Sequence, residues 1–180
     1  MQTQKKIIFR DDDIGYGYFI PSENRHLSYE YVLSKFVEVD QLFIKYGVDH
    51  HIAIVANHFE KAKELIEYIK KHPHIKPQLH CWDHDDYAKL DDHKVINDLK
   101  NGAKKIHDTL GIIPTVFYPP FNSINEFGKL AAKMNGMDTS YRKMSLSGYL
   151  RGRLDDVINF HYWADECKDL EAALKKYTGK

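Results

Sequence analysis

Short apolar runs alternate with longer amphipathic segments along almost the whole chain, and this alternation constrains the fold more than any other feature. The runs expected to form β-strands are residues 5–12, 50–56, 77–82, 114–119, 136–140 and 156–163, of which 136–140 is the weakest. Several are apolar without interruption, which is typical of strands covered on both faces. The pattern therefore predicts a sheet that lies between other layers.

The segments between these runs have the spacing of helices. In residues 28–47, Val32, Phe36 and Val39 recur at three- and four-residue steps, with Ser28 as the expected N-cap and Gly47 as the stop. Further helices are expected at 58–72, 91–111, 123–136 and 165–177, and residues 140–156, which show no clear period, are expected to form a loop. Strands joined by such crossovers predict a parallel α/β fold, either an open sheet or a barrel.

Composition narrows the function. The chain has 180 residues, 43% of them hydrophobic, which predicts one domain over residues 1–180 with a proper core. Lys plus Arg and Asp plus Glu both total 26, so the zero net charge gives no general electrostatic case for nucleic acid or an anionic membrane. The two cysteines make no disulfide framework, and no apolar run is long enough to span a bilayer. The start lacks the apolar stretch of a signal peptide, so a cytoplasmic location is expected.

Polar residues that could take part in catalysis or metal binding lie at the ends of four predicted strands. They are Asp11, Asp12 and Asp13 after the first, His80 and His84 after the third, "YPPFN" (118–122) after the fourth and His161 at the last. In a parallel α/β fold, the carboxyl ends of the strands form the site. This coincidence predicts an active site.

The histidine pair has the spacing of metal ligands. His80 and His84 are four residues apart, and imidazole combined with a carboxylate suits zinc or a similar ion. The zinc-protease helix motif requires Glu after the first histidine, where this chain has Cys81, so that interpretation fails. Such a pair on its own arises readily by chance, but an aspartate from another strand completes a site with open positions for water and substrate.

Other histidines have structural alternatives. His161 alone fits a packed core histidine as well as a catalytic one. His50 and His51 begin a strand and His58 lies where a helix starts, so all three are assigned to structure.

Taken in order, these motifs resemble the polysaccharide deacetylases of the NodB-homology group, carbohydrate esterase family 4. "FRDDDIG" resembles the family's Thr-Phe-Asp-Asp-Gly motif, and "HCWDH" has the spacing of its His-(Ser/Thr)-x-x-His motif. "YPPFN" keeps the two prolines and the aromatic of an Arg-Pro-Pro-Tyr motif, and "NFH" (159–161) matches a final Leu-x-His. "YGVDHHIAIVAN" is similar to a Gly-Val-Pro-Ala-Thr-Phe-Phe stretch. The resemblance implies an irregular (β/α) barrel of about six or seven strands.

The resemblance also implies a reaction, the hydrolysis of an N-acetyl, less often an O-acetyl, group on a sugar or glycan precursor. Asp13, His80 and His84 would hold one divalent ion, with zinc the first candidate, Asp12 would be the base and His161 the acid. The oxyanion would be stabilised by the ion and by a backbone N–H after the prolines, that of Phe121. The residues expected to line the oxyanion and sugar sites are Tyr118, Phe121, Asn122, Trp82 and Trp163, although the two tryptophans fit core packing equally well.

The chain departs from the family pattern in several places. Three aspartates stand where the family has two; Asp12–Asp13 is the chosen register and Asp11–Asp12 the competing one. Tyr118 replaces the motif arginine and Asn122 replaces a glycine. The residues that could supply the missing guanidinium are Arg10, Arg142, Arg151 and Arg153, and the sequence does not choose among them.

Two other functions stay open. A metal-dependent phosphoesterase would need a second metal, for which Asp11 and Asp85 are candidates, but no basic cluster adjoins them. A sugar-binding module that has lost its chemistry is favoured by the missing arginine and disfavoured by the retained aspartates and histidines. A cytoplasmic deacetylase is expected to act on a nucleotide-linked or lipid-linked sugar or a short glycan. The oligomeric state is not predicted.

Overall fold

A parallel sheet forms the centre of the molecule. The structure is a computed structural model that describes residues 6–16, 18–20, 25–163 and 167–180. Its sheet has five strands in the order β5-β4-β1-β7-β6, and every neighbouring pair is parallel. The strands are β1 (Ile8–Ile14), β4 (His50–Val55), β5 (Ile75–Cys81), β6 (Lys143–Ser145) and β7 (Val157–Phe160). The predicted parallel α/β class is confirmed, and all five carboxyl ends meet at one edge.

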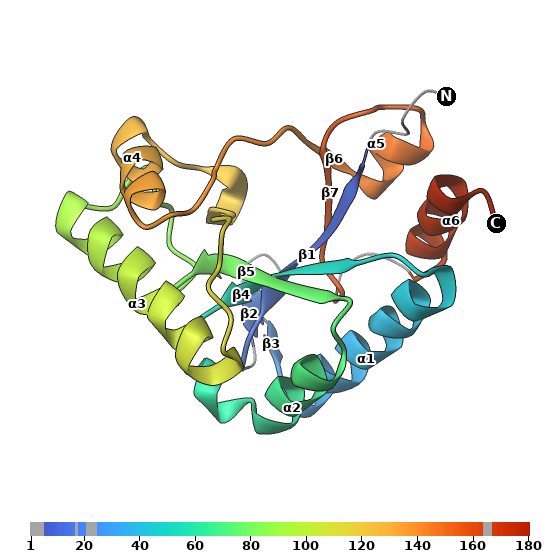
Figure 1. The fold of residues 1–180 in the computed structure, drawn as a ribbon, viewed down its shortest axis with the longest axis horizontal. Coiled ribbons are helices and arrows are strands. Elements are labelled where there is room, and N and C mark those ends of the chain that lie inside the picture. The colour runs from blue at the N-terminus through green and yellow to red at the C-terminus, as the bar shows by residue number, and fades with distance from the viewer. Residues whose placement is uncertain (1–5, 17, 21–24, 164–166) are drawn as a thin grey trace.

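Helices surround the strands (Figure 1). They are α1 (Tyr29–Tyr46), α2 (Lys63–Lys71), α3 (Asp92–Leu110), α4 (Glu126–Met134), α5 (Leu146–Leu150) and α6 (Cys167–Thr178). The expected ends of α1 are present, because the Ser28 side chain accepts from the Tyr31 N–H and Gly47 adopts a left-handed φ of 66°. Among the described residues, no helix is long and apolar enough to cross a membrane.

The predicted strands at 114–119 and 136–140 are reduced to single parallel bridges. Leu79 of β5 pairs with Phe117, and Val116 pairs with Asp138. A few residues later, the same segment forms β6, whose Lys143 pairs with Val157 of β7. Residues 138–145 therefore pair directly with β7 at one edge of the sheet and reach the β5 edge only through the bridged segment 116–117. The arrangement is an irregular, incompletely closed barrel.

The structure differs from the sequence analysis in three local features. Residues 140–156 are not simply a loop, since they contain β6 and α5, and the segment 58–72 is a short 3₁₀ helix (Phe59–Lys61) followed by α2. A hairpin of β2 (Tyr18–Ile20) and β3 (Arg25–Leu27) was not expected. These elements are too short to show a helical or strand period in the sequence. Residue 5 of the first predicted strand and residues 165–166 of the last predicted helix lie outside the described residues.

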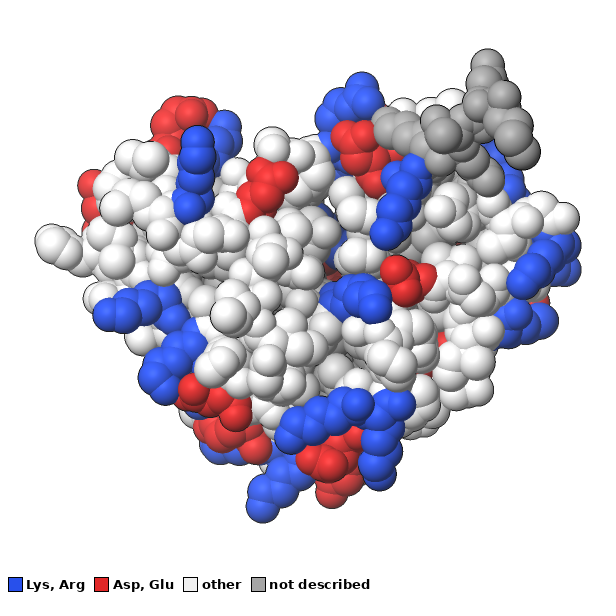
Figure 2. Space-filling model, in the orientation of Figure 1, with Lys and Arg blue, Asp and Glu red and all other residues white. Residues whose placement is uncertain are grey.

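Charges of both signs are intermingled on the face of the molecule shown in Figure 2. This face carries no continuous basic field of the kind that binds a polyanion. It agrees with the balanced composition of the chain.

Candidate active site

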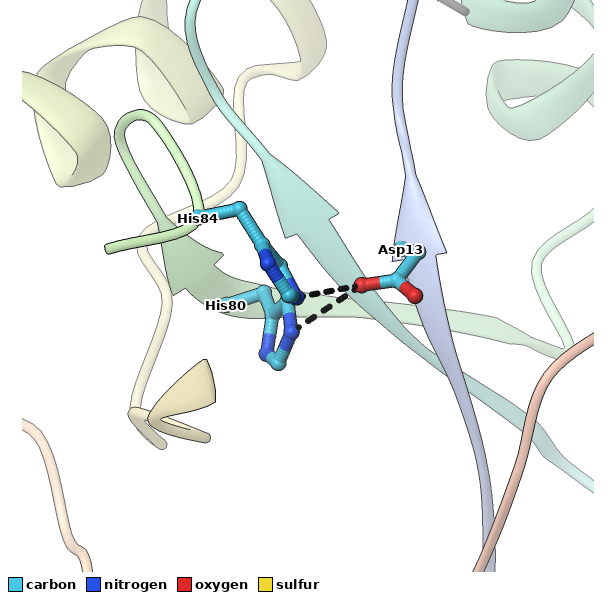
Figure 3. Close-up of side chains that lie close together, drawn as sticks. All are labelled: Asp13, His80 and His84. Carbon is cyan, nitrogen blue, oxygen red and sulfur yellow. Dashed lines mark ion pairs between the residues drawn. The ribbon is translucent and has the colours of Figure 1, made fainter. Parts of the chain in front are cut away.

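Three side chains converge at the carboxyl edge of the sheet. Asp13 comes from β1, His80 from β5 and His84 from the turn after β5 (Figure 3). The Asp13 Oδ1 atom lies 3.2 Å from the Nε2 atom of His80 and 3.0 Å from that of His84. Asp13 and His80 are buried and His84 is partly exposed, so the cluster is open on the His84 side.

Two β-bulges direct these side chains into the site. Asp11 of β1 pairs with Ile52 of β4, and Ile14 pairs with Ile54, so β1 has one more residue than β4 between these two pairs. Within this bulge, Asp13 adopts a left-handed φ of 66°. Leu79 and Cys81 of β5 pair with two consecutive residues of β4, so His80 between them is the extra residue of the bulge. A bulge redirects a side chain that regular alternation would point elsewhere. Both strands therefore present a ligand-type side chain at an irregularity.

Neighbouring groups fix the orientation of both histidines. His80 Nδ1 lies 2.5 Å from the Tyr118 carbonyl oxygen, to which it donates, so its Nε2 lone pair faces Asp13. His84 has a φ of 61°, and its backbone N–H donates to the Cys81 sulfur over 3.1 Å. Burial raises the pKa of the Cys81 thiol, so this sulfur is a hydrogen-bond acceptor in the turn and stays protonated.

The cluster fits a divalent metal ion. One ligand atom from each of Asp13, His80 and His84 lies within 4.8 Å of the other two. Ligand atoms around a tetrahedral zinc ion lie about 3.3–3.6 Å apart, close to the observed nitrogen–oxygen separations. Burial on its own raises the pKa of Asp13, but the contacts with His80 and His84 outweigh it and lower that pKa below its usual range. An anionic carboxylate between two oriented imidazoles is the donor set expected for zinc.

Asp12 lies beside this cluster and faces the barrel interior. Its Oδ2 atom is 2.5 Å from the Nη2 atom of Arg10, and both side chains are buried. The Asp12 Oδ1 atom is also buried but has no hydrogen-bond partner among the described residues. One oxygen is thus held by a cation and the other is available to accept a proton.

Among the four arginines that could supply the missing guanidinium, Arg10 is the one that contacts Asp12. It is fully buried, its guanidinium carbon lies 4.5 Å from the centroid of the Tyr118 ring, and its Nη2 atom is 3.4 Å from the Asn122 Oδ1 atom. The other candidates are elsewhere: Arg142 pairs with Asp156, Arg153 pairs with Asp155, and Arg151 is exposed. The two motif departures, Tyr118 and Asn122, both contact Arg10.

The turn after the prolines has an unusual backbone. Phe121 and Asn122 both have left-handed conformations, with φ of 56° and 51°. Asn tolerates this region, whereas Phe there is strained, and such strain concentrates at functional sites. The Phe121 side chain is 65% exposed, and its ring stands edge-on to His84 with centroids 5.0 Å apart. Phe121 therefore forms an exposed aromatic wall beside the metal-type cluster.

His161 follows the last strand and reaches the same cluster. Its Nε2 atom lies 3.7 Å from the Asp13 Oδ2 atom, and its ring is 5.0 Å from that of Trp163. Trp163 is half-buried at the site. Trp82 contacts a different layer, since Lys105 of α3 lies 5.8 Å from its ring, which favours packing over sugar binding.

Asp11 and Asp85 do not converge on a second metal site. Asp11 points to the helix-covered face, where it accepts a hydrogen bond from the Tyr162 N–H and faces His50. Burial raises the pKa of Asp11 to about 6 against the lowering effect of those two contacts. Asp85 pairs with Lys94 of α3. The geometry favours the Asp12–Asp13 register and gives no support to a two-metal phosphoesterase.

The comparison with protein families decides the classification. A model described as polysaccharide deacetylase matches residues 29–140, a range that contains His80, His84 and the two prolines. The chain belongs to the polysaccharide deacetylase family. The matched range does not include the acidic run or His161, so their place in the site comes from the geometry given above.

Solved structures of this family share the fold. A family 4 carbohydrate esterase from Streptomyces lividans, determined with acetate, has a TM-score of 0.74 at 11% identity over 97% of this chain and 88% of its own. Peptidoglycan deacetylase PdaC from Bacillus subtilis has a TM-score of 0.70 at 16% identity over 98% of this chain and 84% of its own.

A Bacillus anthracis protein described as a pseudoenzyme of the same family is also similar, with a TM-score of 0.73 at 14% identity over 97% of this chain. This chain spans only 61% of that protein's length. No curated protein matches the sequence. At these identities, the likeness shows the fold alone.

Proposed function

We propose that this protein is a metal-dependent carbohydrate deacetylase that hydrolyses an N-acetyl group on a sugar or glycan precursor. Membership of the polysaccharide deacetylase family supports the reaction class. The observation that carries the proposal is the placement of Asp12. It has one oxygen on Arg10 and the other without a hydrogen-bond partner among the described residues, next to the Asp13–His80–His84 cluster.

Asp13, His80 and His84 would hold the divalent ion, which supplies Lewis-acid chemistry by activating water and polarising the acetyl carbonyl. Asp12 accepts the proton of the attacking water as the new carbon–oxygen bond forms. His161 gives a proton to the sugar nitrogen as the carbon–nitrogen bond breaks, which releases acetate and the free amine. Arg10 keeps the Asp12 carboxylate oriented through the contact between its Nη2 atom and the Asp12 Oδ2 atom.

The Phe121 backbone is proposed to stabilise the oxyanion. Its left-handed conformation turns the peptide after the rigid Pro119–Pro120 pair, and its exposed ring borders His84. A donor fixed in this way needs no reorganisation during the reaction. Phe121 and Trp163 flank the cluster and supply apolar faces on which a sugar ring can stack.

Acetate release tests the proposal. The purified protein, stripped with a chelator and reloaded with Zn²⁺, is incubated with N-acetylated oligosaccharides and with sugar nucleotides, and acetate is quantified. We expect zinc-dependent release that is abolished in Asp12→Asn, while Asp108→Asn, which changes an exposed carboxylate on α3, retains it. If the zinc-loaded protein releases no acetate from any acetylated sugar, the deacetylase proposal fails.

A sugar-binding role without catalysis is the second candidate. A similar fold occurs in a protein described as a pseudoenzyme, and the motif arginine is absent here. The position of Arg10 on Asp12 weakens this case, because the guanidinium is supplied from β1. Binding of acetylated oligosaccharides with no acetate release under any metal would favour the binder.

A further inference from the structure

A buried chain of charged side chains lies beneath the candidate site, on the opposite face of β1 from Asp12. It begins at Asp11, whose carboxylate is fully buried. The Tyr162 backbone N–H donates to the Asp11 Oδ1 atom over 2.8 Å. Tyr162 directly follows His161, so this hydrogen bond holds the backbone where His161 leaves β7.

His50 and Asp40 continue the chain away from the site. The His50 Nε2 atom is 3.5 Å from Asp11 Oδ2, and its Nδ1 atom donates to Asp40 Oδ1 over 2.9 Å. Asp40 also accepts from His74 Nε2 and from the Tyr68 hydroxyl, each over 2.9 Å. Both ring nitrogens of His50 face carboxylates, so the protonated imidazolium ring can interact with Asp11 and Asp40 at the same time.

Aromatic rings enclose this unit and keep it rigid. His50 stacks on Phe43 with ring centroids 4.1 Å apart and an interplanar angle of 4°, and Phe36 stacks at 5.3 Å. His50, Asp11 and Asp40 are all fully buried. Buried charges with defined partners favour one arrangement strongly, because any other leaves a charge without a partner. Asp11 therefore cannot readily turn away from Tyr162.

We propose that Asp11, held by His50 and Asp40, is a positioning residue that fixes His161 over the cluster by anchoring the Tyr162 backbone. The inference rests on the proposed function for its catalytic consequence, but the anchor itself is a property of the fold. Asp11 does not touch the reacting atoms. It acts through the peptide between His161 and Tyr162.

Hydrogen exchange of the Tyr162 amide tests the anchor without any assay of activity. In the Asp11→Ala protein, we expect exchange at Tyr162 to accelerate by at least about 10-fold, while amides within Val157–Phe160 keep their rates. Asp11→Asn and Asp40→Asn should accelerate it less, because each keeps an oxygen acceptor but removes a charge. Leu99→Ala, a core truncation on α3, is the control for a general loss of stability.

Steady-state kinetics test the consequence. Misplacing a catalytic group by a small distance lowers kcat more than it changes KM, so Asp11→Ala should lose about 10- to 100-fold in kcat at normal zinc content. Leu99→Ala should keep both parameters in its folded fraction. If Asp11→Ala instead raises KM or lowers the zinc content while kcat is unchanged, Asp11 has a structural role and the proposal is overturned.

The outcomes separate the two proposals. If the wild-type protein releases no acetate but Tyr162 exchange accelerates in the Asp11 variants, the deacetylase assignment fails and the anchor stands. If acetate is released but Tyr162 exchange is unchanged in folded Asp11→Ala, the positioning role is overturned. Should Asp11→Ala fail to fold, unchanged Tyr162 exchange in both Asn variants overturns it as well.

Discussion

The Nη2 atom of Arg10 lies 2.5 Å from the Oδ2 atom of Asp12, two residues further along the same strand. Residues two apart on a strand point to the same face, so both side chains enter the barrel interior together. The family pattern implied an arginine at the position of Tyr118, and here the Tyr118 ring lies against the guanidinium instead. In this chain the guanidinium that contacts the Asp12 carboxylate therefore comes from β1 itself.

Replacement of Arg10 should impair catalysis more than it impairs metal binding. In Arg10→Met, Asp12 keeps its place in the chain but loses the cation that orients it, so kcat should fall about 10- to 100-fold at unchanged zinc content. The unfolding free energy should also fall, by about 3 kcal/mol, because a buried carboxylate loses its partner. Acetate release and denaturant unfolding measure both effects.

Two controls sharpen this prediction. Arg142→Met removes an exposed guanidinium that pairs with Asp156 and should leave kcat unchanged. In the double variant Arg10→Tyr, Tyr118→Arg, the guanidinium returns to the family position, and part of the lost activity should come back. Full activity in Arg10→Met would show that Asp12 needs no cation.

The sequence was sufficient for the framework of the fold and for the location of the candidate site. The apolar runs and the helix caps Ser28 and Gly47 depend on local backbone conformation. They can therefore be recognised from the sequence without knowledge of the tertiary structure. The rule that parallel strands end at one edge then brought Asp13, His80 and His84 to one place.

The irregular features could not be predicted in this way. A bulge adds one residue to a strand without changing its apolar character, so those at Asp13 and His80 leave no mark in the pattern. The choice of Arg10 among four arginines depends on a contact within the barrel. The part played by Asp11 was missed because its partners, Tyr162 and His50, are distant in sequence. Its presence in an acidic run of three was the only available signal.

Loss of a proposed ligand should weaken zinc binding. Asp13→Asn and His80→Ala each remove one of three convergent donors, so zinc affinity should fall by more than the roughly 10- to 100-fold typical of outer-shell changes. Calorimetric titration with Zn²⁺ measures it, and His93→Ala, an exposed histidine on α3, is the matched control. Equal affinity in all three variants would contradict the assigned site.

Zinc should also stabilise the folded protein. At a free zinc concentration about 100 times the dissociation constant, the gain is about 2.7 kcal/mol if the unfolded chain does not bind the ion. The melting temperature should therefore fall when a chelator is added to the wild type. It should be almost insensitive to chelator in Asp13→Asn.

His161 should act in the chemical step. A positioned proton donor is typically worth about 10²–10⁴-fold in rate, so His161→Ala should lose about that factor in kcat with normal folding and zinc content. His107→Ala removes an exposed histidine and should leave kcat unchanged. Unchanged kcat in a folded, zinc-loaded His161→Ala protein would end the general-acid assignment.

His51 should make the fold sensitive to mild acid. Burial lowers the pKa of this half-buried side chain on β4 to about 4, below the value of about 6.5 in the unfolded chain. Because the folded pKa is the lower one, the contribution to stability is complete above pH 6.5 and is lost as the pH falls toward 4. The loss reaches at most about 3 kcal/mol, since each pKa unit corresponds to 1.36 kcal/mol. Denaturant unfolding of the wild type, His51→Gln and the exposed control His107→Gln between pH 7 and pH 4 measures it. Between pH 7 and pH 4, the unfolding free energy of the wild type and of the control should fall by up to about 3 kcal/mol more than that of His51→Gln. Parallel curves for all three would show that His51 takes up its proton equally in the folded and unfolded states.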